Sequence, residues 1–185
     1  MAIIYDTRRL MLMLPENAHL DALVDYHIRN KDFLEPWEPQ RPQDFYTKKY
    51  QKNWIREQKK DTKKLINICF LLAKRDEPER LIGAVSVSNI LYGNFCSAFI
   101  GYRLDKDEVN KGYMTEAVNK VVNVCFEDLM LNRFEASVIP TNIASKTVMK
   151  KTGFTYIGTS SSYLKINGIW QPHEIYEKIN PNRKL

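Results

Sequence analysis

The amino-acid sequence predicts an α/β domain built around a mostly antiparallel sheet. Strand-like runs follow one another from residue 65 to residue 104, and Tyr92-Gly93-Asn94 predicts a hairpin turn between two of them. A strand, a polar turn, a glycine and an amphipathic helix come next, from Ser97 to Leu129. This order differs from the regular strand and helix alternation of a doubly wound sheet. No repeat or linker divides the 185 residues, so we expect one domain spanning residues 1–185.

The N-terminal third predicts a strand and two helices. Thr7 to Leu14 is apolar and strand-like, and Pro15 ends it. Glu16 to Lys31 carries apolar residues at helical spacing and predicts an amphipathic helix. Asp32 to Pro39 contains prolines that prevent a continuing helix, so we expect an irregular, partly rigid segment there. Phe45 to Lys64 predicts a second helix, whose basic end is most simply solvated.

The remainder of the chain predicts mainly strands. The charged tract Lys74 to Arg80 separates the first two of them, and Asp105 to Glu108 is a polar turn. Asn167-Gly168 is a strong signal for a two-residue hairpin loop. The expected strands are Leu65–Ala73, Leu81–Ile90, Asn94–Leu104, Arg133–Ile139, Phe154–Ile166 and Ile169–Ile179, and Asn142–Thr152 is expected to be a short helix that Gly153 ends.

The composition indicates a globular cytoplasmic protein. Hydrophobic residues make up 44% and charged residues 27%. The net charge of +6 favours an anionic ligand or partner, but the charges are spread along the chain, so we expect no direct DNA binding. No signal peptide and no apolar run of membrane-spanning length is present in the sequence, so we expect no membrane association. Cys69, Cys96 and Cys125 lie in separate apolar runs and are expected to be buried thiols, with no metal.

Val109 to Ala117 predicts a phosphate-binding turn. A strand and a polar turn precede Gly112, and a helix follows it. This arrangement leaves several backbone N–H groups unpaired at the positive end of a helix dipole, where they can hold a pyrophosphate. The stretch matches neither a Walker loop nor a dinucleotide fingerprint. Taken alone, the glycine is also explained by a tight turn with no ligand.

This turn resembles the coenzyme A loop of the GNAT acetyltransferase superfamily, Q/R-x-x-G-x-G/A. Gly112 matches the first glycine and Met114 the second small position, whereas Val109 replaces the usual Gln or Arg. Asn142 to Phe154 is similar to the closing motif N-x-x-S-x-x-V-x-x-K-x-G-F of the RimJ/RimL type, which acetylates N-termini of ribosomal proteins. Further stretches resemble the same type: Thr7, Arg9 and Leu10, the loop Phe33–Pro39, Ser88–Phe95 and Tyr163–His173. Of these, Phe33–Pro39 and Tyr163–His173 are most similar to the ribosomal-protein-alanine branch.

The resemblance implies the GNAT fold, with splayed central strands in the sheet and flanking helices, and acetyl-CoA as co-substrate. The pantetheine arm would lie between Ser97–Leu104 and Arg133–Ile139. A main-chain N–H near Tyr102 would stabilise the oxyanion during catalysis. The residues implied to bind the cofactor are Arg103, Leu104, Val109, Asn110, Lys111, Gly112, Tyr113, Met114, Thr115, Asn142 and Ser145.

Asn142 and Ser145 are three residues apart, on one face of the same short helix. By resemblance, Asn142 hydrogen-bonds the cofactor arm and the Ser145 hydroxyl acts as general acid towards the leaving sulfur. Asn142 also suits a helix cap, and one residue can do both. Ser145 taken alone is more simply explained as a solvent-exposed helix serine, and only the motif favours the catalytic role. No cysteine lies in the motif segments, which favours direct transfer without an acyl-enzyme.

The candidate acceptor-binding residues come from two segments. Prolines fix Trp37 in one, and the hairpin brings Trp170 towards it, so two aromatic walls could hold a peptide end; alternatively, both tryptophans belong to the core. A general base is not identified among Glu35, Glu38, His173, Glu174 and Tyr102, and an α-amine with a pKa near ~8 is partly neutral without one. The acceptor-binding candidates are Glu35, Trp37, Glu38, Tyr163, Trp170 and His173.

The function implied is transfer of acetyl from acetyl-CoA to a protein N-terminal amine, most directly an Ala or Ser of a ribosomal protein. The partner would then be a protein N-terminus, with the enzyme a monomer or homodimer. Two alternatives remain. One is an acetyltransferase for a small amine such as a polyamine, an amino acid or an antibiotic. The other is a non-catalytic acyl-CoA-binding ribosome-assembly factor.

Overall fold

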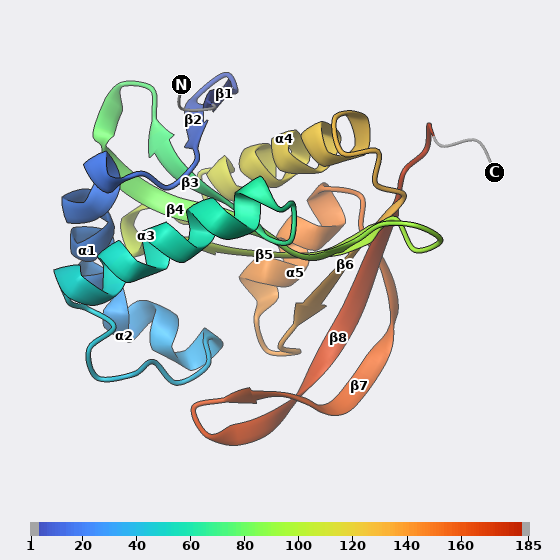
Figure 1. Cartoon of the computed structure of the whole chain (residues 1–185). Coiled ribbons are helices and arrows are strands. Elements are labelled where there is room, and N and C mark those ends of the chain that lie inside the picture. The colour runs from blue at the N-terminus through green and yellow to red at the C-terminus, as the bar shows by residue number, and fades with distance from the viewer. Residues whose placement is uncertain (1–3, 183–185) are drawn as a thin grey trace.

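The structure, a computed structural model, describes residues 4–182, which form an eight-stranded sheet with helices on both faces (Figure 1). The strands are β1 (Ile4–Asp6), β2 (Leu10–Met13), β3 (Ile68–Lys74), β4 (Glu77–Leu91), β5 (Ser97–Leu104), β6 (Arg133–Val138), β7 (Thr155–Ile166) and β8 (Ile169–Ile179). Their order is β1-β2-β3-β4-β5-β6-β8-β7. Only β5 and β6 run parallel; the other neighbouring pairs are antiparallel, which confirms the predicted sheet.

The helices cover the sheet in two layers with separate apolar cores. The helices are α1 (Leu20–Arg29), α2 (Lys31–Leu34), α3 (Lys48–Lys63), α4 (Tyr113–Glu127) and α5 (Ile143–Lys151), with 3₁₀ turns η1 (Asn17–His19), η2 (Glu35–Trp37) and η3 (Lys106–Glu108). One core lies under α4, where Val118, Val121 and Cys125 are buried. The other lies under α1 and α3, where Leu23 and Ile55 are buried.

Strand β3 shows why a continuous apolar run was needed at the centre of the sheet. Ile68 and Phe70 face the α4 core, whereas Cys69 and Leu71 face the α1/α3 core. Successive side chains of a strand point to opposite faces, so a strand covered on both sides must be apolar at every position. The two layers therefore follow directly from the sequence I-C-F-L-L-A of residues 68–73.

The central strands part beside the parallel pairing. Strand β5 pairs with β6 only from Ser97 to Phe99, opposite Arg133 to Glu135. The rest of β5, up to Leu104, pairs with β4 alone. The predicted splaying of the central strands is thus present, and it leaves a gap in the sheet beside Tyr102 and Leu104.

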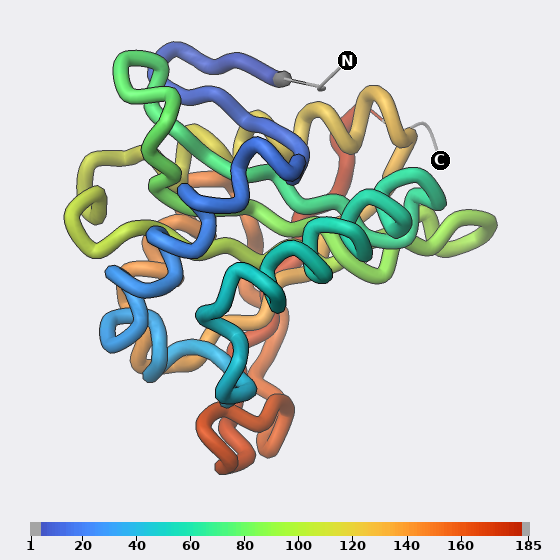
Figure 2. Tube along the Cα trace, turned by 60° about the vertical axis from the view of Figure 1, so that its left-hand side comes forward, coloured from blue at the N-terminus to red at the C-terminus, as the bar shows by residue number. Residues whose placement is uncertain are grey.

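The hairpin β7–β8 extends beyond the body of the protein. Figure 2 shows it, in orange to red, reaching beneath the segment that joins α2 to α3. Asn167, in the hairpin loop, donates a hydrogen bond from Nδ2 to the carbonyl of Glu35 in η2, at 2.9 Å. The sequence-predicted loop at Asn167 and Gly168 is therefore correct, and it contacts a segment more than a hundred residues away.

The first predicted strand, Thr7 to Leu14, is wrong at its start. Thr7 begins a turn, in which its N–H donates to the Leu10 carbonyl at 2.9 Å and its Oγ1 accepts from the Leu10 N–H at 3.0 Å. Strand β2 starts only at Leu10, and β1 precedes the turn. The apolar pattern did not reveal that a threonine side chain closes the turn.

The segment Asp32 to Pro39, predicted as irregular, contains short helical turns. Phe33 and Leu34 lie in α2, and Trp37 ends η2. Pro36 lies in the first turn of η2, where the missing N–H of proline breaks no helical hydrogen bond. The prolines prevent a long helix, as expected, but they permit a new turn to start.

Other boundaries and one cysteine also differ from expectation. Helix α3 begins at Lys48, because Thr47 caps it by accepting from the Tyr50 N–H at 3.2 Å. Strand β4 begins at Glu77, inside the charged tract that we expected to separate two strands. Cys69 and Cys125 are buried, but Cys96 is only partly buried.

Candidate active site

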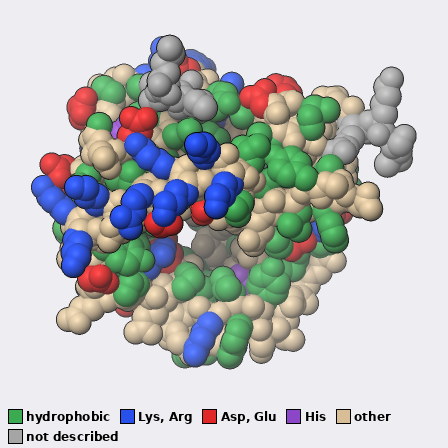
Figure 3. Space-filling view, in the orientation of Figure 1, with side chains coloured by type: hydrophobic (Ala, Val, Ile, Leu, Met, Phe, Trp, Pro, Cys, Tyr) green, Lys and Arg blue, Asp and Glu red, His purple; other side chains and the backbone are tan. Residues whose placement is uncertain are grey.

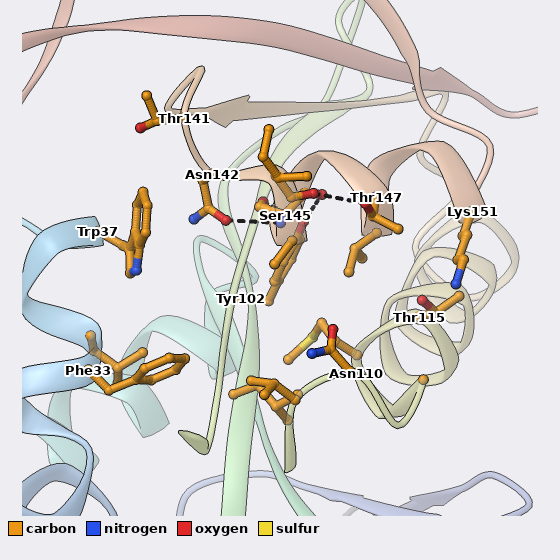
Figure 4. A pocket seen from close by; sticks show the side chains of 18 residues that line it. Phe33, Trp37, Tyr102, Asn110, Thr115, Thr141, Asn142, Ser145, Thr147 and Lys151 are labelled. Atoms are coloured by element: carbon orange, nitrogen blue, oxygen red, sulfur yellow. Dashed lines mark hydrogen bonds between the residues drawn. The ribbon is translucent and has the colours of Figure 1, made fainter. Parts of the chain in front are cut away.

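The gap beside β5 opens into a cleft of about 510 Å³ (Figure 4). Tyr102 and Leu104 of β5 form its floor, and segments on three sides complete it. We call Asn110–Thr115 the cofactor end and Phe33, Leu34 and Trp37 the acceptor end. The lining residues are Phe33, Leu34, Trp37, Tyr102, Leu104, Val109, Asn110, Gly112, Met114, Thr115, Thr141, Asn142, Ile143, Ala144, Ser145, Thr147, Val148 and Lys151.

The cofactor end has the geometry of an anion-binding turn. Asn110 and Gly112 both have left-handed backbones, with φ of 61° and 80°. Gly112 is the N-cap of α4, and its carbonyl accepts the first helical hydrogen bond, from the Glu116 N–H at 3.1 Å. The N–H groups of residues 113–115 precede that bond and have no partner within the helix. They lie at the positive end of the α4 dipole, where a phosphate is favoured.

Arg9 fastens the first hairpin to this turn. Its Nε donates to Glu116 at 2.7 Å and its Nη1 to the Lys111 carbonyl at 2.9 Å. Its guanidinium also lies 4.4 Å from the ring centre of Tyr113. Thr7 Oγ1 donates to Glu116 at 2.6 Å. Burial would raise the pKa of Glu116, but the hydrogen bonds from Thr7 and Arg9 outweigh it and hold the pKa below its ordinary value.

Buried ion pairs anchor the residues just before the turn. Asp105 is fully buried, and its carboxylate accepts from Arg29 at 2.7 Å and Arg80 at 3.2 Å. Glu108 is 4% exposed and accepts from Arg80 and Lys111, each at 3.0 Å. Although burial acts to raise the pKa of both carboxyls, both pKa values lie below the ordinary ones: the Asp107 N–H and Arg29 lower that of Asp105, and Lys111 and Arg80 lower that of Glu108. Two ionised carboxylates therefore fix η3, and with it the entry to the turn.

Tyr102, Asn142 and Ser145 meet at the centre of the cleft. Asn142 caps α5 by accepting from the Ser145 N–H at 3.0 Å. The Tyr102 hydroxyl lies 2.8 Å from Ser145 Oγ and donates to the Ser145 carbonyl at 3.1 Å. Burial raises the pKa of Tyr102 far above neutrality, so the phenol stays protonated. If the single phenol proton is directed to Ser145 Oγ instead of the carbonyl, the serine hydroxyl can donate into the cleft, as a general acid requires.

The acceptor end is aromatic and open to solvent. Phe33 is 38% and Trp37 is 37% exposed, which excludes a core role for Trp37. Both rings extend towards the cleft from the α2–η2 segment (Figure 4). Glu38 is not among the lining residues; Arg41 donates to it at 2.6 Å. Glu35 contacts the hairpin through its carbonyl.

The hairpin candidates lie apart from the cleft lining. Trp170 is 59% exposed, so it is not a core residue either. His173 is 3% exposed, and its ring centre lies 5.5 Å from that of Tyr163. The Glu174 carboxylate accepts from Lys146 at 2.8 Å and from Tyr176 at 2.6 Å, and these hydrogen bonds lower its pKa. A carboxylate with both oxygens engaged and a lowered pKa is a weak base.

Several sequence-predicted cofactor residues point elsewhere, and others were missed. Arg103, Lys111 and Tyr113 are outside the lining, although Lys111 and Tyr113 contribute to the turn through Glu108 and Arg9. The missed lining residues are Phe33, Leu34, Thr141, Ile143, Ala144, Thr147, Val148 and Lys151. The sequence could have predicted part of this set, because residues 143, 147 and 151 are spaced four residues apart and therefore lie on one helix face.

Within residues 4–182, no three or more His, Cys, Asp or Glu side chains are grouped so as to hold a metal ion. None of the helices in this range has the length and apolarity required to cross a membrane.

Known proteins resemble this chain in sequence and in fold. The family model of the acetyltransferase (GNAT) domain matches residues 9–155. The chain is 40% identical over 153 residues to the probable N-acetyltransferase YjcK of Bacillus subtilis, covering 83% of this chain and 84% of that protein. The structure of the ribosomal-protein-S5-alanine acetyltransferase of Vibrio fischeri superposes with a TM-score of 0.93 at 31% identity, covering 99% of this chain and 100% of that one.

A more distant likeness concerns the fold alone. RimJ of Mycobacterium smegmatis, solved in complex with CoA-disulfide, superposes with a TM-score of 0.89 at 23% identity, covering 95% of this chain and 86% of that one. The family match over residues 9–155, the sequence relatives and the fold all indicate the same family. The chain therefore belongs to the acetyltransferase (GNAT) domain family and is an N-acetyltransferase of the RimJ/RimL type.

Proposed function

We propose that this protein transfers the acetyl group of acetyl-CoA to the N-terminal α-amine of a protein, with an N-terminal Ala or Ser of a ribosomal protein as the preferred acceptor. The V. fischeri relative, whose name specifies an alanine of ribosomal protein S5, supports this choice. On this proposal the enzyme acts in the cytoplasm, and its partner is a protein N-terminus.

The observation that carries the proposal is the composition of the cleft. Its acceptor end presents two exposed aromatic rings, from Phe33 and Trp37. Among the described residues that line the cleft, none is Asp or Glu. A polyamine carries several ammonium groups and needs carboxylates around it, whereas a chain end gains from flat apolar faces that have few rotamers to lose. The cleft therefore favours a peptide over a polyamine.

The cofactor end suits the other substrate. The amides of residues 110–115 would hold the pyrophosphate of coenzyme A, and the gap beside Leu104 would receive the pantetheine arm. Asn142 caps α5 at the point where the arm would pass. Arg9 would support the turn from behind, through its bond to the Lys111 carbonyl.

Tyr102 and Ser145 would then serve the chemical step. The amine nitrogen attacks the thioester carbonyl carbon, the carbon–sulfur bond breaks, and the amine loses one proton while the thiolate gains one. Ser145 would supply the proton to sulfur, with Tyr102 donating to its Oγ as the charge shifts. No described lining residue is a carboxylate that could take the amine proton. A free α-amine with a pKa near ~8 is partly neutral already, so a water molecule is a sufficient acceptor.

An acceptor panel tests the proposal. We expect free CoA to be released faster with peptides beginning in Ala or Ser than with spermidine, free amino acids or aminoglycosides. Trp37→Ala should raise the KM for the peptide more than the KM for acetyl-CoA, with an unchanged circular dichroism spectrum. Trp170→Ala is the matched control, because that ring is exposed but outside the cleft lining. Faster turnover of a small amine than of every peptide would reject the N-terminal assignment.

A further inference from the structure

Arg103 lies between two residues of the cleft floor, but it is not among the residues that line the cleft. Its neighbours Tyr102 and Leu104 both line the cleft, and successive side chains of a strand point to opposite faces. Arg103 is paired across the sheet with Ala84, which belongs to the α1/α3 core. The Arg103 side chain therefore passes to the α1/α3 side of the sheet, directly behind the point where Tyr102 meets Ser145.

The side chain of Arg103, which is partly buried, lacks the described partners that the partly buried Arg29 and Arg80 have. Its Nε is buried and has no hydrogen-bond acceptor among the described residues. None of the carboxylates in residues 4–182 forms an ion pair with it, whereas Arg29 and Arg80 on the same side both bind Asp105. A buried donor without an acceptor is rare in folded proteins and costs about 1–3 kcal/mol, more when it is charged. Such a group points to a ligand.

Two more buried hydrogen-bonding groups without described partners belong to α1 and α3, on the side of the sheet that Arg103 faces. Tyr26 Oη and Gln51 Oε1 are both buried and unbonded among the described residues. The Arg103 charge lowers the pKa values of Tyr26 and of the adjacent His27, in each case as a smaller effect than burial. Burial and that charge lower the pKa of His27 to about 2, so its ring stays neutral and supplies no second cation. The carboxylate of Glu38, which also acts on Tyr26, is held by Arg41.

This side of the molecule is open to an acceptor. Figure 3 shows a hollow between the row of Lys and Arg side chains on α3 and the β7–β8 hairpin. Leu34 lines the cleft and also belongs to the α1/α3 core, so the acceptor end of the cleft borders the side of the sheet that Arg103 faces. An extended chain spans at most ~3.6 Å per residue, so a group near Arg103 belongs within roughly the first three residues of the acceptor.

We propose that Arg103 binds a carboxylate of the acceptor, close to the amine that is acetylated, and so selects an acidic acceptor. The proposal rests on the acetyl transfer to an amine described above. The planar guanidinium matches a carboxylate with two parallel hydrogen bonds, and Tyr26 Oη can add a third donor. The same chemistry has two sources: an Asp or Glu side chain near a protein N-terminus, or the α-carboxylate of a free amino acid.

The test compares acidic acceptors with their amides. Peptides Ala-Asp-x and Ala-Ala-Glu would be assayed against Ala-Asn-x and Ala-Ala-Gln, and a free amino acid against its amide. We expect kcat/KM to be roughly 10-fold to 100-fold higher for the acid than for the amide of the preferred pair. The amide cannot form the charge-assisted hydrogen bond, and its removal costs binding energy of this size. Arg103→Gln should abolish this preference without changing the KM for acetyl-CoA, and Arg103→Lys should retain part of it.

The controls separate this inference from the function itself. Lys52→Gln removes an exposed cation of α3 and should leave the acid preference intact. The comparison of acid with amide in the unaltered protein gives an answer even if Arg103→Gln fails to fold. Acetylation of peptides with equal kcat/KM for acid and amide would overturn the role of Arg103 and leave the proposed function standing. A lack of turnover with every peptide and amino acid would overturn the proposed function and this inference together.

Discussion

At the cofactor end of the cleft, the turn is fixed by buried ion pairs, whereas at the acceptor end one exposed hydrogen bond joins Asn167 to the Glu35 carbonyl. Leaving a buried carboxylate without its partner costs about 1–3 kcal/mol, while an ordinary hydrogen bond contributes about 0.5–1.5 kcal/mol. The cofactor end is therefore rigid before any ligand arrives. The acceptor end can adjust or diverge with little cost to the fold, which suits the part of an enzyme that selects its substrate.

The largest expected effect lies where the two ends meet. Ser145→Ala should lower kcat by roughly 10-fold to 1000-fold and change the KM for acetyl-CoA little, because the hydroxyl acts when the thiolate leaves. Steady-state kinetics with the best peptide measure both values. Tyr102→Phe keeps the serine and removes its 2.8 Å partner, so a smaller loss of kcat is expected. An unchanged kcat for Ser145→Ala would mean that the proton comes from water.

The next effect tests the rigidity of the cofactor end. Gly112 has φ of 80°, and a Cβ there would lie 3.4 Å from Arg9 Nη2, so the branches of a valine would crowd the guanidinium. Strain of about 1–2 kcal/mol in the turn predicts roughly 10-fold weaker CoA binding to Gly112→Val, measured by calorimetry. Gly93→Val is the control, since Gly93 has φ of 69° and open space around it. Equal CoA affinity in the two variants would show that the turn does not bind CoA.

The third effect concerns acid stability. The pKa values of Asp105 and Glu108 are lowered in the folded protein, so their contribution to stability is complete above about pH 4.5, the ordinary Glu pKa, and is lost as the pH falls through the lowered values. The melting temperature should therefore drop on acidification below about pH 4.5. Glu108→Gln should lose about 1–3 kcal/mol at pH 7 and show a shallower drop. If the melting temperatures of the two proteins fell equally with decreasing pH, this would contradict the anchoring role of Glu108.

The smallest effect is expected at the acceptor end. Asn167 has φ of 45°, which Gly also adopts, so Asn167→Gly keeps the hairpin loop but removes the hydrogen bond to Glu35. We expect a rise of about 2-fold to 10-fold in the peptide KM and no change in the KM for acetyl-CoA. Asn167→Asp, which removes the donor without shortening the side chain, should behave alike. A change in the acetyl-CoA KM would show that the two ends are coupled.

The same contrast explains how far the sequence could predict the structure. Gly112 before α4, Asn142 before α5 and the Asn167-Gly168 loop were found because their roles are local and follow from residue type. The contact of Arg9 with Glu116 joins residues 107 positions apart, and no periodicity signals such a pair. The sequence likewise did not reveal that Arg103 points away from the cleft, because the strand register decides which face each residue takes.

The parting of β5 from β6 would couple the stability of this enzyme to any small molecule that binds there. Beyond Phe99, the free protein has a break inside its own sheet, with backbone groups of β5 that β6 does not reach. A molecule that binds only the folded chain at this break stabilises it by mass action, by about 2.7 kcal/mol at a hundredfold excess over its Kd. Proteases attack the transiently opened state, so the half-life of the chain should lengthen as that molecule accumulates. In a cell, the level of the enzyme would then follow the supply of its own substrate.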